Sequence, residues 1–328
     1  MQTRDIIVIG ASMGGVEALS NLVGQLPANL PASIFVVQHT SPESPGLLAH
    51  ILDNRGPLRA SNAESGMPVE RGRIYVAPPN RHLLLTEDGI HVVFGARENR
   101  SRPAVDPLFR TAAVNYGSRV IGVVLTGLLG DGASGLLAVE ACGGVPIVQA
   151  PSDAAYPEMP TNALAYVNLA RQIPLAEMGE ALVRLSKEQA PDSPAVPEVL
   201  RLEASLTERA METDDWNQVP GTPTRFTCPE CMGAIQEIRE NGMARYRCRV
   251  GHAYSADDMV REKAKSLENT LWIALQTLEE RAQMLETMAK EHRAHGWMRG
   301  SEAYASRARE TRVHGDELRE LLASLGTD

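Results

Sequence analysis

The segment Ile6-Ile7-Val8-Ile9-Gly10-Ala11-Ser12-Met13-Gly14-Gly15 decides the fold of the first half of the chain. Its apolar start predicts a buried strand, and its glycine-rich end predicts a tight turn that opens a helix. Similar β-branched runs recur at 34–37, 73–77, 120–125 and 146–149, with helical stretches such as 15–25 and 132–142 between several of them. Short apolar strands that alternate with helices are typical of a parallel sheet covered on both faces. The sequence therefore predicts an open, doubly wound, Rossmann-like α/β domain.

The glycine-rich turn fits two kinds of chemistry. A dinucleotide-binding turn, G-x-G-x-x-G, needs glycine where Ser12 stands, and no acidic residue follows the next strand, which ends in Gln38 and His39. The pattern G-x-S-x-G is matched by Gly10, Ser12 and Gly14 and is typical of a nucleophilic serine. A serine that merely caps the helix fits the same residues, so the turn alone does not identify a nucleophile.

Two residues at other strand ends favour the nucleophile. His39 follows the strand at 34–37, and Asp131 follows the strand at 120–125. Ligands bind outside the carboxyl ends of parallel strands, so we expect these side chains to lie with Ser12 on one edge of the sheet. A serine hydroxyl needs a base, and the base needs an orienting carboxylate. The chain order Ser-His-Asp differs from the Ser-Asp-His order of α/β-hydrolases, which disfavours a lipase-like fold.

Five segments across the first half carry a family resemblance. They are Gly10–Gly15, Gln38-His39, the run 75–78 with Arg81-His82, the run 102–109 (RPAVDPLF), and the run 122–135 with its Thr126-Gly127 and Asp131-Gly132. Together they resemble the catalytic domain of the chemotaxis protein-glutamate methylesterases, the CheB family. The resemblance implies a triad of Ser12, His39 and Asp131 that hydrolyses glutamyl methyl esters on helical chemoreceptors without a cofactor. It also implies that some members deamidate receptor glutamines.

The sequence departs from the family pattern in two places near the predicted site. The family turn usually has threonine where this chain has Met13, and the loop before the aspartate usually reads Gly-Met-Gly-Asn rather than the sequence at 127–130, Gly-Leu-Leu-Gly. Backbone N–H groups can bind an oxyanion whatever their side chains are. We therefore take Met13, Gly14 and Leu128 as candidates for the turn and the oxyanion site, and expect the altered loop to affect substrate preference more than chemistry.

Two further expectations concern substrate binding by arginines and the way in which the predicted enzyme is controlled. Arg81 and Arg102 are candidates for binding an acidic helical substrate. Typical family members carry an N-terminal phosphoacceptor domain, whereas this sequence starts at the first strand of the catalytic domain. We therefore expect control by a means other than phosphorylation within the same chain.

A cluster of metal-binding residue types lies in the second half. Cys228 and Cys231 form a C-x-x-C knuckle, and Cys248 and His252 form a second pair. Two such pairs suit tetrahedral zinc. The sequence between them alternates around Asn241-Gly242, which predicts a hairpin that brings the pairs together, as in a zinc ribbon. A redox C-x-x-C is the alternative, but this segment is too short for the thioredoxin-like sheet that it needs.

The rest of the second half is predicted to be linker and helix. We expect a catalytic domain at 1–188, a linker at 189–224 with a short helix at 198–211 and a polar stretch at 214–223, a zinc-ribbon-like segment at 225–254, and a helical hairpin at 255–328. Ser255 is the expected cap of the long helix, and His295-Gly296 divides the hairpin. The hairpin's narrow apolar stripe suits self-association, packing on the catalytic domain, or docking to a partner.

Composition limits the functions open to this chain of 328 residues. Its net charge of −9 gives no electrostatic support for nucleic-acid binding. Its apolar runs are too short to span a membrane, and no signal peptide is evident, so we expect a soluble cytoplasmic protein. The leading hypothesis is a serine hydrolase of methylated glutamate. The alternatives are a non-catalytic scaffold that keeps an esterase fold, and a nucleotide-binding protein.

Overall fold

A computed structural model describes residues 2–209 and 219–325. The chain divides into two compact units, Met1–Asp258 and Met259–Asp328. The predicted stretch at 214–218 and the last two residues of the predicted helix at 198–211 lie outside the described residues.

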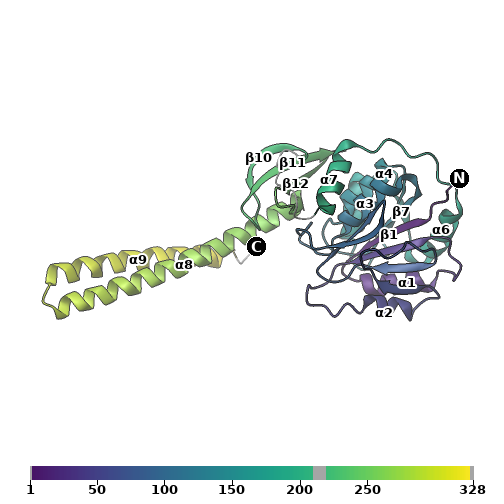
Figure 1. The fold of residues 1–328 in the computed structure, drawn as a ribbon. Coiled ribbons are helices and arrows are strands. Elements are labelled where there is room, and N and C mark those ends of the chain that lie inside the picture. Colours follow the sequence, from purple (N-terminus) through teal and green to yellow (C-terminus); the bar gives the residue numbers. More distant parts are fainter. Residues whose placement is uncertain (1, 210–218, 326–328) are drawn as a thin grey trace. The chain divides into compact units, whose positions relative to one another are not determined.

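A seven-stranded sheet forms the centre of the first unit, and each neighbouring pair of strands is parallel (Figure 1). In spatial order the strands are β3 (Arg59–Asn62), β4 (Arg73–Val76), β2 (Ser33–Gln38), β1 (Ile6–Ala11), β7 (Val120–Val124), β8 (Val145–Gln149) and β9 (Arg171–Ile173). Gly10 lies opposite Val37 on one side and Val124 on the other. The carboxyl ends of β2, β1 and β7 therefore lie next to one another.

Helices cover both faces of this sheet because the side chains of a strand alternate between the faces. Ile6 and Val8 pack with α3 (Val105–Tyr116) and α4 (Ala133–Ala141), whereas Ile7 and Ile9 face the other way. The opposite face holds α1 (Gly15–Gly24), α2 (Leu48–Asp53) and α6 (Leu175–Lys187), and Figure 1 shows α1 and α2 across the sheet from α3. The remaining elements are α5 (Glu158–Tyr166), the turn η1 (Gly117–Arg119) and a hairpin of β5 (His82–Thr86) and β6 (Gly89–Val93). The predicted α/β class is confirmed.

A second, four-stranded sheet belongs to the same unit and follows helix α7 (Glu198–Glu208). Its antiparallel strands are β10 (Thr222–Thr227), β11 (Ala234–Glu240), β12 (Met243–Cys248) and β13 (Ala253–Ser255). The hairpin turn at Asn241-Gly242 is confirmed, with φ angles of 45° and 82° that suit these two residue types. The predicted polar stretch at 214–223 ends earlier than expected, because β10 already begins at Thr222.

A buried ion pair ties this small sheet to α7. Arg245 of β12 donates two hydrogen bonds, of 2.9 and 2.7 Å, to the carboxylate of Glu203, which is fully buried. Each group satisfies the charge of the other away from water, so loss of one partner leaves the other uncompensated.

The second unit is a helical hairpin, as predicted. Its helices are α8 (Ala256–Ala294), whose first residues belong to the first unit, and α9 (Met298–Leu325). Ser255 caps α8 by accepting a 3.1 Å hydrogen bond from the N–H of Asp258. Ion pairs of Arg319 with Glu279 and of Arg312 with Glu286, both 2.6 Å, show that the helices run antiparallel. No helix among the described residues is long and apolar enough to cross a membrane.

We predict that Arg245→Met lowers the free energy of opening of α7 and β12 by about 3–5 kcal/mol, because the buried Glu203 carboxylate loses both hydrogen bonds from Arg245 and keeps the longer ion pair with Arg247, at 3.8 Å. Urea-dependent hydrogen exchange of peptides from 198–208 and 243–248 measures this free energy. The control is Arg319→Met, which removes half-exposed ion pairs with Glu279 and Asp316 in the helical hairpin. Because water screens these charges, the substitution should change the exchange of peptides from 279–286 and 312–319 much less. Equal effects of the two substitutions would contradict the importance of burial.

Candidate active site

The turn after β1 presents Ser12 at the edge of the large sheet. The N–H of Ser12 donates a 3.0 Å hydrogen bond to the carbonyl of Thr126, and the Ser12 carbonyl accepts one of 2.7 Å from Nε2 of Gln38. The Gln38 amide lies so close to the turn that a Cβ atom on Gly15 would come within 2.0 Å of its Oε1. The neighbouring strands β2 and β7 therefore fix the backbone on which the hydroxyl is carried.

Ser12, His39 and Asp131, the three residues predicted at strand ends, lie in one hydrogen-bonded series. The hydroxyl of Ser12 lies 3.1 Å from Nδ1 of His39, and Nε2 of His39 lies 2.7 Å from Oδ2 of Asp131. An ionised carboxylate only accepts hydrogen bonds, so Nε2 carries the imidazole proton and Nδ1 is left to accept the proton of Ser12. This arrangement can transfer a proton from the hydroxyl to the imidazole.

The carboxylate of Asp131 is buried, with 2% of the residue exposed, and is surrounded by donors. Besides His39, it accepts hydrogen bonds from the backbone N–H groups of Val105 (2.7 Å), Asp106 (3.1 Å) and Gly132 (2.9 Å), and from the Asn99 side chain (2.8 Å). Burial opposes ionisation, but the hydrogen bonds and the charge of His39 outweigh it and hold the pKa of Asp131 below its ordinary value. Asp131 is therefore an anion at neutral pH.

Asp106 and Asn99 complete this buried group, and sequence reasoning assigned neither of them a role. The Asp106 carboxylate accepts hydrogen bonds from the N–H groups of Gly132 (3.0 Å) and Gly135 (2.6 Å) at the start of α4, and from Asn99 (2.7 Å). Burial and the neighbouring Asp131 charge raise the pKa of Asp106 to about 7. Asp106 lies in the RPAVDPLF run, but nothing in that run marks its carboxylate as a partner of Asp131.

The loop between β7 and α4 lies directly over the serine turn. A Cβ atom on Gly127 would come within 2.7 Å of the Ser12 Cβ and 2.2 Å of the Met159 sulfur, so only glycine fits there without a shift. Among the described residues, none accepts a hydrogen bond from the N–H of Met13, Gly14 or Leu128. These predicted oxyanion donors are therefore available in the turn and in the loop over it.

An apolar groove of about 260 Å³ lies beside His39 and was not predicted. Its apolar lining includes Val16, Leu47, Leu48, Ile51 and Pro79. Such a groove can take an aliphatic side chain next to the imidazole of His39.

The two arginines predicted to bind substrate, Arg81 and Arg102, both lie against the ring of Phe94. The guanidinium of Arg102 lies 3.8 Å from the ring centre of Phe94 and donates hydrogen bonds to Asn80, and that of Arg81 lies 4.9 Å from the same ring. Within the described part of the chain, neither arginine hydrogen-bonds to Ser12, His39 or Asp131. Contact of the two arginines with a substrate stays a prediction.

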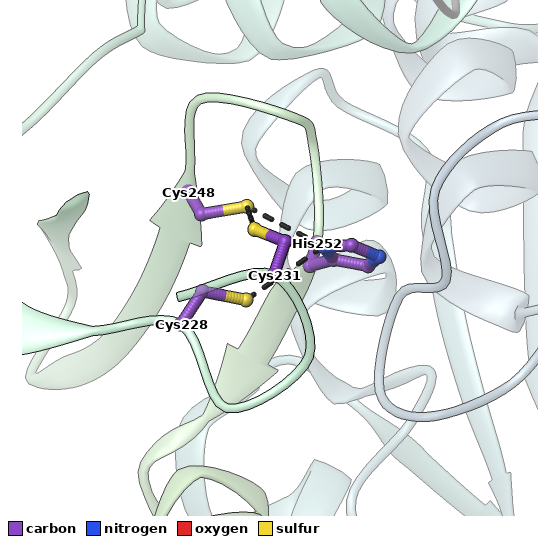
Figure 2. A group of neighbouring side chains, drawn as sticks. All are labelled: Cys228, Cys231, Cys248 and His252. Carbon is purple, nitrogen blue, oxygen red and sulfur yellow. Dashed lines mark hydrogen bonds between the residues drawn. The ribbon is translucent and has the colours of Figure 1, made fainter. Parts of the chain in front are cut away.

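The four predicted metal ligands come together at one end of the small sheet (Figure 2). We call residues 228–253, which contain them, the Cys/His segment. Their ligand atoms all lie within 4.8 Å of one another. Sγ of Cys231 is 3.7 Å from Sγ of Cys248, and Nδ1 of His252 is 3.7 Å from Sγ of Cys228 and 3.5 Å from Sγ of Cys248. A tetrahedral zinc ion with Zn–S bonds of about 2.3 Å separates its sulfur ligands by about 3.8 Å, so the spacing fits this ion.

Groups outside the cluster orient its ligands. Nε2 of His252 lies 3.3 Å from the carboxylate of Glu230, which favours the tautomer with the proton on Nε2 and leaves Nδ1 to bind a metal. The Cys228 carbonyl accepts a hydrogen bond from the N–H of Met232, and the Cys248 carbonyl accepts one from that of Gly251. Each pair of ligands is therefore carried on a tight turn.

Comparison with known proteins gives consistent results for the first half of the chain. The family model described as CheB methylesterase matches residues 7–182. The protein-glutamate methylesterase/protein-glutamine glutaminase 2 of Methanosarcina acetivorans is 41% identical over 191 residues, which cover 56% of this chain and 53% of that protein. A protein of the same name from Rhodospirillum rubrum is 37% identical over 186 residues, which cover 56% of this chain and 51% of that protein.

Other similar proteins are matched over nearly their full length. A relative from Leptospira interrogans is 36% identical over 184 residues, 56% of this chain and 95% of its own length. The crystal structure of the Thermotoga maritima CheB methylesterase catalytic domain superposes with a TM-score of 0.52 and 34% identity, covering 55% of this chain and 98% of that one. The chain thus spans about half the length of the Methanosarcina and Rhodospirillum relatives.

We predict that Gly127→Ala slows the labelling of Ser12 by a serine-directed phosphonate by about tenfold or more, because the added methyl group displaces the serine turn. The control is Gly130→Ala in the same loop, where a Cβ atom would meet nothing closer than 3.7 Å. Mass spectrometry of the labelled chain gives both rates. Equal labelling of the two variants would contradict the tight contact between loop and turn.

Proposed function

Because the chain belongs to the CheB methylesterase family, we propose that it hydrolyses methyl esters of glutamate side chains on a helical, chemoreceptor-like protein. The observation that carries this proposal is the series of hydrogen bonds from Ser12 through His39 to Asp131. All three residues lie within the stretch that matches the family. The free thiols of Cys142, Cys228, Cys231 and Cys248 suit a cytoplasmic location.

The first step of the proposed reaction is acyl transfer to Ser12. Nδ1 of His39 takes the hydroxyl proton while Oγ attacks the ester carbonyl carbon. Asp131 stabilises the imidazolium that forms, and N–H groups of Met13, Gly14 or Leu128 bind the oxyanion of the tetrahedral intermediate. The intermediate collapses when the methoxide takes the proton from His39 and leaves as methanol.

The second step regenerates the enzyme. Water gives a proton to Nδ1 of His39 and attacks the acyl carbon, and the proton returns to Oγ of Ser12 as the glutamate carboxylate is released. The same series of steps deamidates glutamine when ammonia is the leaving group. The names of the Methanosarcina and Rhodospirillum relatives include both a methylesterase and a glutaminase activity. We propose deamidation as a second activity of this site.

The surroundings of the site suit a methylated, acidic helix. The apolar groove beside His39 can take the aliphatic part of a glutamyl ester. The positive charges of Arg81 and Arg102 around Phe94 can bind the acidic side chains of such a helix. This part of the proposal concerns binding and not the chemical steps.

We predict that Ser12→Ala abolishes methanol release from a methylated chemoreceptor fragment and that Asp131→Asn lowers kcat about 10⁴-fold. The control is Ser20→Ala on α1, whose hydroxyl, among the residues that the structure describes, donates only to the carbonyl of Val16 in its own helix. A fragment with glutamine at the methylation sites tests deamidation through ammonia release. Methanol release at the wild-type rate by Ser12→Ala would overturn the proposed function.

We also propose that the Cys/His segment binds one structural zinc ion through Cys228, Cys231, Cys248 and His252. The support is the near-tetrahedral spacing of the ligand atoms and the contact of His252 with Glu230. Zinc would cross-link the two turns of a small sheet that has little apolar core of its own. The chemical steps of the proposed ester hydrolysis use Ser12, His39 and Asp131 and none of these four ligands.

We predict about one zinc ion per purified chain and its loss in Cys248→Ala, since three protein ligands hold the ion less well than four. The control is Cys142→Ala, because Cys142 is buried in the core of the large sheet and should not affect the metal content. Elemental analysis of both variants provides the measurement. Full zinc content in Cys248→Ala would contradict the proposed ligand set.

A further inference from the structure

Asn99 links the Cys/His segment to the proposed triad, because its backbone hydrogen-bonds to Ala253 and its side chain to Asp131. Its buried side-chain amide donates both of its protons, one to Asp131 (2.8 Å) and one to Asp106 (2.7 Å). It thus bridges two carboxylates that would otherwise repel each other. Its backbone has a φ angle of 47°, in the left-handed region that asparagine tolerates better than most residues.

The backbone of Asn99 is held by β13. The N–H of Asn99 donates a 2.8 Å hydrogen bond to the carbonyl of Ala253, and the N–H of Ala253 donates one of 3.3 Å to the carbonyl of Arg97. Ala253 directly follows His252, one of the four proposed metal ligands. Two backbone hydrogen bonds therefore join the loop that carries Asn99 to the residue next to the metal site.

The side chain of Glu98 also holds this loop. It is buried and accepts hydrogen bonds from Arg110 of α3 (2.8 Å) and Arg247 of β12 (3.0 Å). Burial opposes its ionisation, but the charges of the two arginines outweigh burial and hold the pKa of Glu98 well below its usual range. Since Arg247 precedes the ligand Cys248, this ion pair is a second connection between the loop and the Cys/His segment.

The two proposed ligands Cys248 and His252 are also joined through their backbones. The carbonyl of His252 accepts a 2.9 Å hydrogen bond from the N–H of Cys248, so the two ligands close a short loop that ends at Ala253. A metal ion bound to both side chains would fix this loop and the carbonyl that Asn99 contacts. Without the ion, His252 is held by the backbone hydrogen bond to Cys248, by the contact of Nε2 with Glu230 and by the contacts of Nδ1 with the thiols of Cys228 and Cys248.

We propose that Asn99 is a positioning residue for Asp131 and that metal binding by the Cys/His segment holds it in place, so that metal occupancy sets the rate of the reaction at Ser12. This inference rests on the proposed function and adds a means of control to it. When Asn99 is displaced, Asp131 loses a donor, and the bridge to Asp106 is left to the N–H of Gly132. The carboxylate then orients His39 less well, whereas the groove that binds the substrate is unchanged.

The first experiment changes Asn99 in the metal-loaded chain. Asn99→Ala should lower kcat for methanol release about ten- to hundredfold, the range for losing a hydrogen bond to a buried charge, with little change in KM. The matched control is Asn115→Ala, which removes an amide that donates to the carbonyls of Leu85 and Thr111 instead. An unchanged kcat in Asn99→Ala, or an equal loss in Asn115→Ala, would overturn the positioning role.

The second experiment removes the metal with a chelator and restores it with zinc alone. The readout is the rate at which a phosphonate labels Ser12, which needs no receptor substrate. Removal should slow labelling of the wild-type chain and have little further effect on Asn99→Ala, because both changes act through one contact. The coupling would be overturned if metal removal slowed labelling by the same factor in both chains, or did not slow it in the wild-type chain.

Hydrogen exchange measured while the chelator removes the metal shows whether the structural change is local. We expect faster exchange at 97–101 and 248–253 and unchanged exchange in β1, β2 and β7. Loss of protection throughout the large sheet would overturn the inference, since the metal would then only maintain the fold. If the chain labels normally but releases no methanol from any receptor fragment, the proposed function fails, and the labelling experiment still decides the coupling.

Discussion

The buried carboxylate of Asp131 is the interaction on which the whole candidate site depends. A buried charge is stable only when hydrogen bonds and opposite charge replace water, and here the donors come from separate parts of the chain. The start of α3 supplies the N–H groups of Val105 and Asp106, the start of α4 supplies that of Gly132, and an irregular loop supplies Asn99. Because these elements converge on one group, the carboxylate has a fixed position against His39.

This fixed position determines which imidazole nitrogen can act as a base. In the serine-protease template the aspartate binds Nδ1 and the serine faces Nε2. Here Asp131 binds Nε2 and Ser12 faces Nδ1. The geometry therefore allows the same proton transfer with the roles of the two ring nitrogens exchanged.

The sequence allowed prediction of the parts of the site that follow from parallel-sheet geometry and ligand spacing. Ser12, His39 and Asp131 could be grouped because each follows a strand, and the carboxyl ends of parallel strands share an edge. The cluster from Cys228 to His252 could be predicted because paired ligands at short spacing are specific for tetrahedral metals. Asn99 could not be predicted, because its place depends on the path of an irregular loop that periodicity does not describe.

The buried charges were also beyond sequence reasoning, for a different physical reason. Glu203, Arg245 and Arg247 occur among many charged residues that most often lie on solvated faces, and only the packing of β12 against α7 buries them. Such pairs add little net stability compared with apolar contacts, but breaking one is costly. They therefore define how the small sheet packs on the rest of the first unit.

The position of the imidazole proton tests the central claim most directly. Nitrogen-15 NMR of the chain labelled at histidine, in the state where His39 is neutral, shows which ring nitrogen carries hydrogen. With Asp131 holding Nε2, we predict the proton on Nε2 and a bare Nδ1 in the wild-type chain, and a loss of this preference in Asp131→Asn. A proton on Nδ1 of His39 in the wild-type chain would contradict the account, since that nitrogen could not then act as the base for Ser12.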